Sequence, residues 1–367
     1  MASTTAARVI VSPPTGPLLV EDFEFGDPLP GQVLIRQHAS GICHSQLHTI
    51  HRANRTTAAL LGHESTGDVL SVGEGVTHVA PGDRVFVTWV PRNPAEADAG
   101  WRGGYQLDFG GGTAVTADVF TWATHTIADQ SLVVKAPMSM ATDVTSIIGC
   151  AVMTGSGAVL NTADVQVGQS VAVFGAGGVG LSAIVAAHVR GASPIIAVDL
   201  DDEKLAFAER FGATHTVNSR DGGAIDAIRE ITRGRYSGLG FRGIAVEGVD
   251  WAFDCIGVAS TMAQIFEAAR PGRFGVSKGG TAVLVGIPMT RLDVSAIDLV
   301  LQEKAYMGSI GGSCTPDRDF DTFVEWFEDG RLPLNDLVTT RFAIDEVNEA
   351  VDALTAGRIA GRAIFEF

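Results

Sequence analysis

The stretch SVAVFGAGGVG, residues 170–180, decides the fold of this 367-residue chain. A short apolar run ends in Gly175, Gly177 and Gly180, which have G-x-G-x-x-G spacing, and an apolar segment, LSAIVAAHVRGA, follows at 181–192. This pattern predicts a buried strand, a tight turn and a helix, the arrangement that binds a dinucleotide pyrophosphate. Gly175 would permit the turn, Gly177 the approach of the backbone to the phosphates, and Gly180 the close packing of helix on strand. The helix N-terminus would offer free N–H groups and a partial positive charge.

An acidic residue stands where this motif needs one. Asp199 ends the next strand pattern, 19 residues after Gly180. Its carboxylate can accept hydrogen bonds from both ribose hydroxyls, but it would repel a 2′-phosphate. Asp201 and Asp202 strengthen that repulsion, so the sequence favours NAD over NADP. The alternative, a structural turn followed by an exposed aspartate, is disfavoured because strand, turn, helix and acidic residue all occur in order.

Strand and helix patterns alternate from residue 170 to residue 287. The further strand patterns are PIIAVDLD (194–201), THTVNS (214–219), VDWAFDCIG (249–257) and GTAVLVGI (280–287). The helix patterns between them are DEKLAFAERFGA (202–213), GAIDAIREITRG (223–234) and STMAQIFEAARPG (260–272). Alternation at this spacing predicts a doubly wound parallel sheet.

The segments before and after this region show a different pattern of predicted strands and helices. The first 150 residues consist mostly of short strand patterns, such as GQVLIRQHASGIC (31–43) and DRVFVTWV (83–90), separated by turn signals. The tail, residues 342–367, reads as a helix and then a strand that could return to the first domain. We therefore expect an α/β protein with a β-rich domain at 1–151, a dinucleotide-binding domain at 152–310 and a C-terminal return at 311–367.

The charge and the cysteine content of the chain limit the partners that it can bind and the cellular compartment in which it is expected. The net charge of −16 would repel nucleic acid. We expect no membrane span, because no stretch approaches about 18 consecutive apolar residues. We also expect no signal peptide, because the N-terminus lacks a basic start before an apolar run. Four scattered cysteines are too few for a disulfide framework, so a cytoplasmic location is expected. They are Cys43, Cys150, Cys255 and Cys314.

Three separated residues are candidate metal ligands. Cys43 lies in GICHSQLHTIH (41–51), His63 in LLGHESTG (60–67) and Cys150 in IGCAVMTG (148–155). Catalytic zinc takes three protein ligands and leaves one position open. Taken singly, each residue is more often a buried core cysteine or a loop histidine than a ligand.

The order of motifs along the chain resembles the zinc-dependent alcohol dehydrogenases of the medium-chain dehydrogenase/reductase (MDR) superfamily. The resemblance covers nearly the whole sequence. The motifs that carry it are GICHSQLH, GHE, VGEGVTHVAPGDRV, IGC…TG, VFGAGGVG…VDLDDEK, VGIP and GRAIFEF. It implies a GroES-like β domain, a Rossmann domain and an active site in the cleft between them.

The resemblance assigns roles to the residues of the first domain. It implies one catalytic zinc held by Cys43, His63 and Cys150, with Glu64 near the metal. Ser45 would receive the proton of the alcohol, and His48 would pass that proton on toward solvent. Ser45 and His48 are three residues apart, so on a helical turn they share one face. His51 has no matching role and is expected to be solvated.

Cofactor and substrate residues follow from the same resemblance. The expected NAD contacts are His44, Thr154, Gly175, Gly177, Gly178, Val179, Gly180, Asp199, Lys204 and Arg362. Trp89 and Trp122 fall at positions that line the substrate pocket, although either could equally be a core residue.

Two departures from the family pattern are visible. Residues 91–119 contain no cysteine where the family often carries a four-cysteine lobe for a structural zinc, so one zinc per chain is expected and this loop should pack differently. Gln46 stands where the family commonly has an aspartate that orients a zinc-bound histidine. Loss of that carboxylate should modestly lower the metal affinity or alter the potential at the zinc. We expect no loss of function, because glutamine can still accept a hydrogen bond from an imidazole N–H.

The sequence therefore predicts reversible, NAD-linked oxidation of a primary or secondary alcohol to an aldehyde or ketone, with the tryptophans favouring a hydrophobic or aromatic substrate. A homodimer or homotetramer is expected, and the strand near AYMGSIGG (305–312) could pair across a two-fold axis. Three alternatives stay open: a nicotinoprotein that retains its NAD, a zinc-free reductase of the same fold, and a non-catalytic NAD-binding protein.

Overall fold

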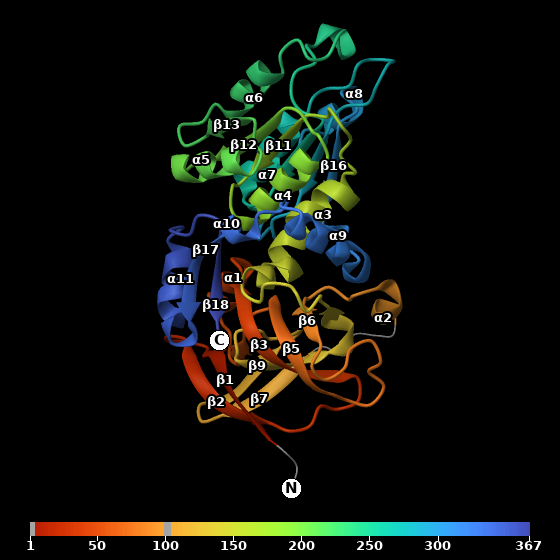
Figure 1. Ribbon diagram of the computed structural model, residues 1–367. Helices are drawn as coiled ribbons and strands as arrows, with labels where there is room; N and C mark the ends of the chain where they lie inside the picture. The colour runs from red at the N-terminus through yellow and green to blue at the C-terminus, as the bar shows by residue number, and fades with distance from the viewer. Residues whose placement is uncertain (1–3, 99–103) are drawn as a thin grey trace. The chain divides into compact units, whose positions relative to one another are not determined.

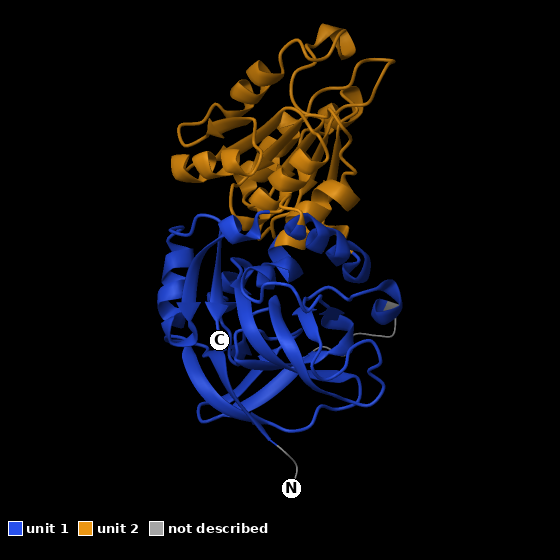
Figure 2. Cartoon of the chain, viewed as in Figure 1, with its two compact units in different colours: residues 1–151, 315–328, 333–367 blue, residues 152–314, 329–332 orange. Residues whose placement is uncertain are grey.

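The computed structural model describes residues 4–98 and 104–367 (Figure 1). The chain forms two compact units (Figure 2). Unit 1 comprises Met1–Ala151, Thr315–Glu328 and Pro333–Phe367, and unit 2 comprises Val152–Cys314 and Asp329–Leu332. Residues 311–314 and 329–332 thus belong to unit 2, whereas the sequence had grouped them with the C-terminal return.

Unit 2 is built on a parallel six-stranded sheet with the strand order β13-β12-β11-β14-β15-β16. Its strands are β11 (Val171–Phe174), β12 (Ile195–Asp199), β13 (His215–Asn218), β14 (Trp251–Asp254), β15 (Thr281–Leu284) and β16 (Ala305–Gly308). The strand order reverses between β11 and β14, where Val171 lies opposite both Ile195 and Trp251. The carboxyl end of β11 is therefore the switch point at which doubly wound sheets bind ligands. The predicted Rossmann-type fold is confirmed.

Four helices of unit 2 follow its strands as the sequence predicts, and the two at 153–157 and 296–301 were not predicted. They are α3 (Met153–Gly157), α4 (Gly178–Val189), α5 (Asp202–Arg210), α6 (Ala224–Thr232), α7 (Ala259–Ala268) and α8 (Ala296–Leu301), with short 3₁₀ turns at Phe241–Gly243 and Gly311–Ser313. Asp201 starts α5 by accepting hydrogen bonds from the N–H groups of Glu203 and Lys204. Buried side chains of α6, α7 and the strands, among them Phe174 and Ile196, form one apolar core.

Unit 1 contains two sheets among its described residues. One has the order β2-β1-β4-β8-β7, and the other has the order β10-β6-β5-β3-β18-β17 with β9 paired to β3. The strands are β1 (Thr5–Ser12), β2 (Leu19–Phe25), β3 (Gln32–Ile42), β4 (Ala58–Leu60), β5 (Ser65–Val72), β6 (Arg84–Val87), β7 (Tyr105–Phe109), β8 (Gly112–Thr116), β9 (His125–Asp129), β10 (Val133–Lys135), β17 (Val338–Ala343) and β18 (Arg362–Glu366). Ala363 of β18 pairs with Ile42 of β3, so the C-terminal strand returns to the first unit.

Short helices complete unit 1. They are α1 (Ser45–Ile50), α2 (Pro94–Asp98), α9 (Pro316–Glu328), α10 (Leu334–Leu337) and α11 (Val347–Thr355), with 3₁₀ turns at Gln130–Leu132, Val144–Ile147 and Ile344–Glu346. The cysteine-free segment 91–119 contributes α2 and the hairpin β7-β8, whose strand β8 pairs with β4. Residues 99–103 of that segment lie outside the described part of the chain.

One helical segment corrects an expectation from the sequence. Residues Val144–Thr162 form a continuous helical stretch of 19 residues with a mean hydropathy of 1.4, long and apolar enough by those two measures to cross a membrane. The expectation that no stretch is long and apolar enough was therefore wrong. Small and polar residues interrupt the apolar run, but they do not end the helix, and its average hydropathy stays high. Of this stretch, 83% is buried inside the protein, which is the burial of a core helix.

Candidate metal and cofactor sites

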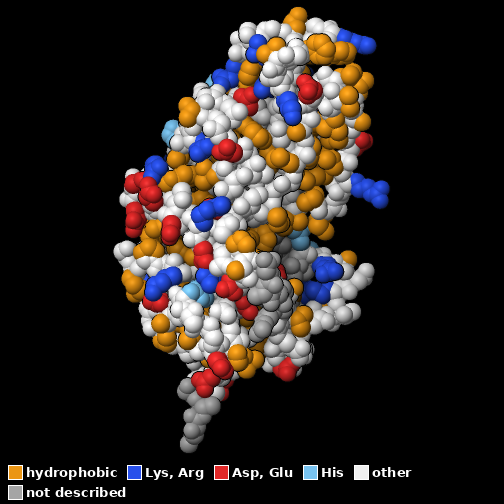
Figure 3. Space-filling model, turned by 90° about the vertical axis from the view of Figure 1, so that its right-hand side faces the viewer, with side chains coloured by type: hydrophobic (Ala, Val, Ile, Leu, Met, Phe, Trp, Pro, Cys, Tyr) orange, Lys and Arg blue, Asp and Glu red, His pale blue; other side chains and the backbone are white. Residues whose placement is uncertain are grey.

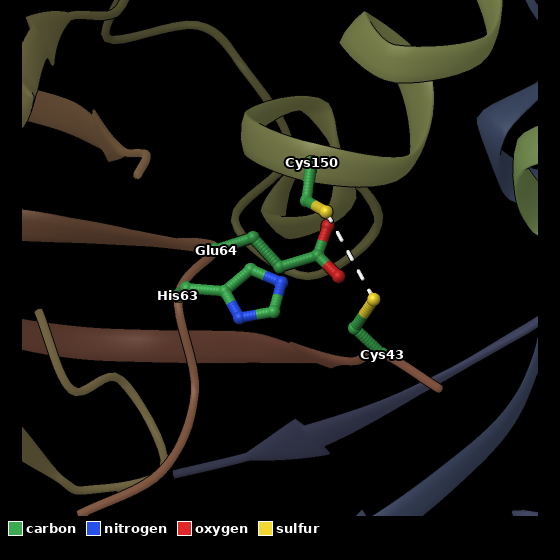
Figure 4. A group of neighbouring side chains, drawn as sticks. All are labelled: Cys43, His63, Glu64 and Cys150. Carbon is green, nitrogen blue, oxygen red and sulfur yellow. Dashed lines mark hydrogen bonds between the residues drawn. The ribbon is translucent and has the colours of Figure 1, made fainter. Parts of the chain in front are cut away.

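Four side chains converge in unit 1 from three separate segments (Figure 4). Cys43 follows the end of β3, and His63 and Glu64 lie in the short connection between β4 and β5. Cys150 belongs to Ile148–Val152, one of the two π-helical segments inside the 144–162 helix; the other is Ala158–Thr162. Such turns widen a helix locally and are frequent at functional sites. The segments are distant in sequence, so the cluster exists only in the folded chain.

The donor atoms of this cluster suit a zinc ion. One ligand atom from each of Cys43, His63, Glu64 and Cys150 lies within 4.8 Å of every other. The two sulfur atoms are 3.9 Å apart. Sulfurs bound to a tetrahedral zinc at about 2.3 Å would be about 3.8 Å apart. Two thiols and one imidazole are a donor set that zinc prefers, and the three predicted ligands are therefore brought together as such a site requires.

Glu64 has hydrogen-bond partners of its own. Its side chain is fully buried, with one carboxylate oxygen paired with the Arg362 guanidinium and the other accepting the Ala151 N–H at 3.2 Å. Arg362 is the first residue of β18, whose pairing with β3 brings it to the cluster. A Cβ at Gly41 would lie 2.4 Å from the Glu64 carboxyl carbon, so this glycine leaves room for the carboxylate. The sequence did not identify the Glu64–Arg362 pair or the role of Gly41.

The side chains of the cluster shift one another's pKa values in opposite directions. The hydrogen bond from the Cys150 thiol lowers the pKa of Cys43 well below its usual value, and the same bond raises the pKa of Cys150. Burial acts to lower the pKa of His63, but the hydrogen bond and the charge of Cys43 outweigh it and raise that pKa. Burial raises the pKa of Glu64 to about 7 despite the nearby Arg362. Without a cation, the ionised forms of Cys150 and Glu64 are therefore disfavoured, and a bound cation would favour them.

Gln46 contacts His63 on the side of the ring that faces away from the cluster. Its amide nitrogen lies 2.6 Å from Nδ1 of His63, and its amide oxygen accepts the Gly62 N–H at 2.9 Å. The other ring nitrogen, Nε2, therefore points toward Glu64 and the cysteines, as Figure 4 shows.

Helix α1 presents the predicted proton-transfer residues. The Ser45 hydroxyl donates to the Cys43 sulfur at 3.2 Å, which places it beside the cluster. His48 is exposed one turn later, and its ring centroid is 6.2 Å from that of His44. His51, for which no role was predicted, is exposed at the end of the helix.

The two predicted pocket tryptophans lie in different environments. The Trp89 ring packs edge-on against His63 with 6.4 Å between centroids, and its indole N–H is buried without a hydrogen-bond partner among the described residues. Trp122 is fully buried in an apolar cluster, stacks edge-on against Phe365 and donates to the Gly41 carbonyl. Trp122 is thus a core residue, which was the alternative that the sequence left open.

The glycine turn of unit 2 has the geometry that the motif predicts. Gly175 has φ +95°, and a Cβ at Gly180 would lie 1.8 Å from the Gly175 carbonyl oxygen. A Cβ at Gly177 would meet nothing within 4 Å, so the space over this residue is open to a ligand. Gly178 and Val179 form the first turn of α4. The turn can therefore cradle phosphate at a helix N-terminus.

The remaining predicted cofactor residues lie near this turn or beside the zinc cluster. Asp199 ends β12, and its carboxylate accepts the Ala176 N–H at 2.7 Å, which ties it to the glycine turn. Gly155, next to Thr154, packs against the Val179 carbonyl oxygen, and the Thr154 hydroxyl is buried without a partner among the described residues. Lys204 lies in the first turn of α5. Arg362 contacts Glu64, and its predicted contact with the pyrophosphate stays a prediction.

Comparison with known proteins agrees with this geometry. Residues 29–138 match the alcohol dehydrogenase GroES-like domain family, and residues 178–329 match the zinc-binding dehydrogenase family. An alcohol dehydrogenase class-3 of Cereibacter sphaeroides is 30% identical, with 93% of this chain and 94% of that protein covered. An S-(hydroxymethyl)glutathione dehydrogenase of Paracoccus denitrificans is 29% identical with the same coverage. A benzyl alcohol dehydrogenase structure from Acinetobacter calcoaceticus superposes with a TM-score of 0.84 at 27% identity over 99% of each chain.

The chain therefore belongs to the zinc-type alcohol dehydrogenases of the medium-chain dehydrogenase/reductase superfamily, and it is an NAD-dependent oxidoreductase.

Proposed function

We propose that this enzyme catalyses the reversible, NAD-linked oxidation of a primary or secondary alcohol with a hydrophobic or aromatic side chain. The convergence of Cys43, His63 and Cys150 within 4.8 Å is the observation that carries the proposal. The Trp89 ring beside His63 supports an apolar substrate, because it would supply a flat apolar surface close to the reacting group.

The residues of this chain divide the chemistry between them. Cys43, His63 and Cys150 hold one zinc per chain, and Gly175, Gly177 and Asp199 hold the NAD. When bound, zinc supplies a Lewis acid that lowers the pKa of an alcohol, and NAD supplies the hydride acceptor. The alcohol carbon loses a hydride and its hydroxyl loses a proton, which leaves a carbonyl group.

The proton leaves through helix α1. Ser45 receives it, since its hydroxyl already lies against the Cys43 sulfur and can turn toward a substrate hydroxyl. His48 takes it onward, because it lies one turn along the same helix face and its ring is exposed to solvent. His44, at the start of α1, and Arg362 then serve the cofactor phosphates.

The test is a panel of aliphatic, benzylic, secondary and polyol alcohols assayed with NAD and with NADP, before and after zinc removal. We expect turnover of benzylic or other apolar alcohols with NAD, loss of that turnover without zinc, and recovery when zinc is returned. Turnover that survives zinc removal would contradict the proposal and favour a zinc-free reductase. NAD or NADH released when the dialysed protein is denatured would identify a nicotinoprotein, and a fully zinc-loaded protein that is inactive on every alcohol would favour a non-catalytic NAD-binding role.

We propose that a second copy of this chain covers the β16 edge of unit 2. Among the described residues, strand β16 ends its sheet with one side unpaired, and the neighbouring α8 has no buried residue. Ile297, Val300 and Ile310 expose 63%, 73% and 72% of their surface. Figure 3 views the side on which β16 and α8 lie in Figure 1, and hydrophobic side chains gather there over unit 2. An apolar surface beside an open strand edge suits pairing across a two-fold axis.

Light scattering tests this pairing. We expect the native chain to be at least dimeric and Val300→Asp to dissociate it, whereas Val167→Asp, at a valine exposed elsewhere on unit 2, leaves it unchanged. A monomeric native chain would overturn the proposal.

We also propose a reducing, cytoplasmic location. The sulfur atoms of Cys43 and Cys150, 3.9 Å apart, must remain thiols to bind metal. Thiol titration of freshly isolated, zinc-stripped protein should find all four cysteines reduced, and a Cys43–Cys150 disulfide would count against this location.

A further inference from the structure

Two loops of unit 2 pack against each other. Residues 234–246 lie between α6 and β14, and residues 271–279 lie between α7 and β15. The Phe241 ring of the first loop contacts the Phe274 ring of the second, with 5.3 Å between the centroids. The first loop lies at the upper end of unit 2 in Figure 1, where Figure 3 shows hydrophobic and basic side chains near one another. We refer to the two segments as the paired loops.

Both loops are anchored to one buried carboxylate. Arg270 donates to Asp250 at 2.7 Å and to the Lys278 carbonyl at 2.8 Å, and its guanidinium lies over the Tyr236 ring at 4.8 Å. The Tyr236 hydroxyl in turn donates to Asp250 at 2.7 Å. A satisfied buried network of this kind makes its surroundings rigid. The paired loops therefore have a defined conformation, and the side chains that they expose are held in solvent by the fold.

Each loop closes into a hairpin with a short tip. The N–H groups of Arg273 and Ser277 donate to each other's carbonyl oxygens at 2.9 and 3.0 Å, which leaves residues 274–276 as the tip of the second loop. The first loop closes in a similar way, from the Gly240 N–H to the Ile244 carbonyl at 2.8 Å. A hairpin tip projects from a surface and does not by itself enclose a groove.

Apolar side chains are exposed at these tips. Leu239, Phe274 and Val276 expose 61%, 68% and 67% of their surface. Single exposed apolar residues are ordinary, but a group of them on two packed loops marks a site of interaction. The paired loops are therefore an interaction surface whose partner has to offer an apolar environment.

The only charged residues of the paired loops are basic. They contain Arg235, Arg242, Arg273 and Lys278 and neither aspartate nor glutamate, in a chain whose net charge is −16. Arg242 and Lys278 are exposed, and the Arg242 guanidinium lies over the Phe241 ring at 5.2 Å. Apolar side chains beside cations complement a partner that is apolar inside and anionic at its surface.

A lipid bilayer fits these properties better than a protein does. A second copy of the chain, paired about a two-fold axis, would bring the same cations against each other. A peptide segment binds in a groove or along an open strand edge, and hairpin tips offer neither. A bilayer needs no groove, because apolar side chains enter the head-group region while cations meet the lipid phosphates. The negative charge of the rest of the chain is screened beyond about 8 Å at physiological ionic strength.

We propose that the paired loops dock on the surface of a bilayer that contains anionic phospholipids. Phe274 and Val276 enter the head-group region, and Arg242 and Lys278 contact the lipid phosphates. Neither contribution is large alone, so the docking is reversible and requires both. The contact is peripheral and agrees with a cytoplasmic location, because the cytoplasmic leaflet carries anionic lipids. It does not depend on the zinc site or on the alcohol substrate.

Co-sedimentation of the native chain with vesicles tests the docking. One set of vesicles contains phosphatidylcholine alone, and the other contains equal amounts of phosphatidylcholine and phosphatidylglycerol. We expect binding to the anionic vesicles only, and we expect it to weaken as salt is added because the cations are exposed. Equal binding to both sets, or binding to neither, would overturn the inference.

Two variants separate the apolar contribution from the charge. Phe274→Ser removes the aromatic ring of the second tip and should weaken binding about 10-fold. Lys278→Gln removes one cation and should weaken binding about 5-fold. The matched controls are Val167→Ser and Arg358→Gln, which change an exposed valine elsewhere on unit 2 and an exposed arginine of unit 1 and should bind like the native chain.

The variants also decide between the alternative partners. If Phe274→Ser bound as well as the native chain while Lys278→Gln bound less, charge attraction alone would account for the binding and the inference would fail. Light scattering of Phe274→Ser adds a second readout, and we expect the oligomeric state of the native chain. A Phe274→Ser protein that dissociates would show that a second copy covers the paired loops, which would also overturn the inference.

Discussion

The buried carboxylates of Asp250 in unit 2 and Glu64 in unit 1 have opposite surroundings. Asp250 accepts hydrogen bonds from the Ser170 N–H, the Ser170 hydroxyl and the Tyr236 hydroxyl at 2.7–3.0 Å, and from the Arg270 guanidinium at 2.7 Å. Burial acts to raise the pKa of Asp250, but these donors outweigh it and lower the pKa. Glu64 has fewer donors and lies beside the Cys43 sulfur, and burial raises its pKa to about 7.

The two carboxylates therefore serve different purposes. Asp250, which precedes β14, holds Ser170, which precedes β11, and hydrogen-bond donors of the chain itself match its charge. Arg270, which pairs with it, also lies over the Tyr236 ring at 4.8 Å. The Glu64 cluster brings three acidic side chains together with fewer donors than Asp250 has, and a bound cation would stabilise their ionised forms. Full satisfaction within the chain characterises a structural network, whereas incomplete satisfaction characterises a site that binds something.

The largest expected effect concerns the cluster of unit 1. Cys150→Ser removes one candidate ligand, and we expect zinc binding and alcohol turnover to fall by more than about 100-fold, because loss of a ligand exceeds loss of a partner behind it. The free energy of unfolding of the zinc-free protein should change little. Cys314→Ser is the matched control, since a serine hydroxyl can also donate to the Met153 carbonyl that Cys314 contacts at 3.3 Å. Equal turnover in both variants would refute the ligand assignment.

A change in the Asp250 network of unit 2 should lower the stability of the fold and leave zinc binding unchanged, the reverse of what is expected for Cys150→Ser. Asp250→Ala leaves the largely buried Arg270 guanidinium without its carboxylate, and we expect a loss of about 3 kcal/mol in the free energy of unfolding, the lower end for breaking a buried ion pair, because two backbone carbonyls still accept from Arg270. Zinc affinity should be unchanged. Asp226→Ala is the control: it removes an exposed aspartate that pairs with Arg229 at 3.6 Å, and surface pairs contribute less than about 1 kcal/mol. Equal effects of the two variants on urea unfolding would show that the Asp250 network is not structural.

The pH dependence of stability sharpens the same comparison. The pKa of Asp250 is lower in the folded chain than in the unfolded chain. Its stabilisation is therefore fully present above the unfolded pKa of about 4 and is lost as pH falls through the lower, folded pKa. We expect the difference in unfolding free energy between the native chain and Asp250→Asn to be constant from pH 7 to pH 5 and to shrink toward pH 3. A difference that did not change with pH would contradict a charged Asp250.

The sequence was most informative where chemistry depends on neighbouring residues. The turn at Gly175–Gly180 and the acidic end of β12 could be predicted because their spacing lies within one strand-turn-helix-strand unit. The zinc ligands could not be derived from spacing, since Cys43 and Cys150 are 107 residues apart. They were predicted through resemblance to a family, and the structure then brought them together.

Other features depend on contacts that neither spacing nor resemblance supplies. Ser170 and Asp250 are 80 residues apart, and Glu64 and Arg362 are 298 apart, so neither pair leaves a local pattern. Trp122 was ambiguous for the same reason, because its burial depends on packing against Phe365 near the other end of the chain. The orientation of the Gln46 amide is set by the Gly62 N–H, a backbone group that no sequence pattern reveals.

The smallest predicted effect tests whether the Asp250 network owes its strength to charge. Tyr236→Phe removes the hydroxyl that donates to Asp250 at 2.7 Å but keeps the ring under Arg270. Hydrogen bonds to charged groups contribute about 1.5–3 kcal/mol, and the three remaining donors to Asp250 favour a loss near 1.5 kcal/mol. Tyr306→Phe is the matched control, because its hydroxyl donates to the neutral Met262 carbonyl at 3.1 Å and should cost about 1 kcal/mol or less. Urea unfolding at pH 7 measures both variants. As pH falls below the unfolded pKa of about 4, the contribution of the charged Asp250 decreases, so the effect of Tyr236→Phe should shrink toward that of Tyr306→Phe. An effect of Tyr236→Phe that is equally large at pH 7 and at acid pH would show that the hydroxyl, not the charge, accounts for the stabilisation.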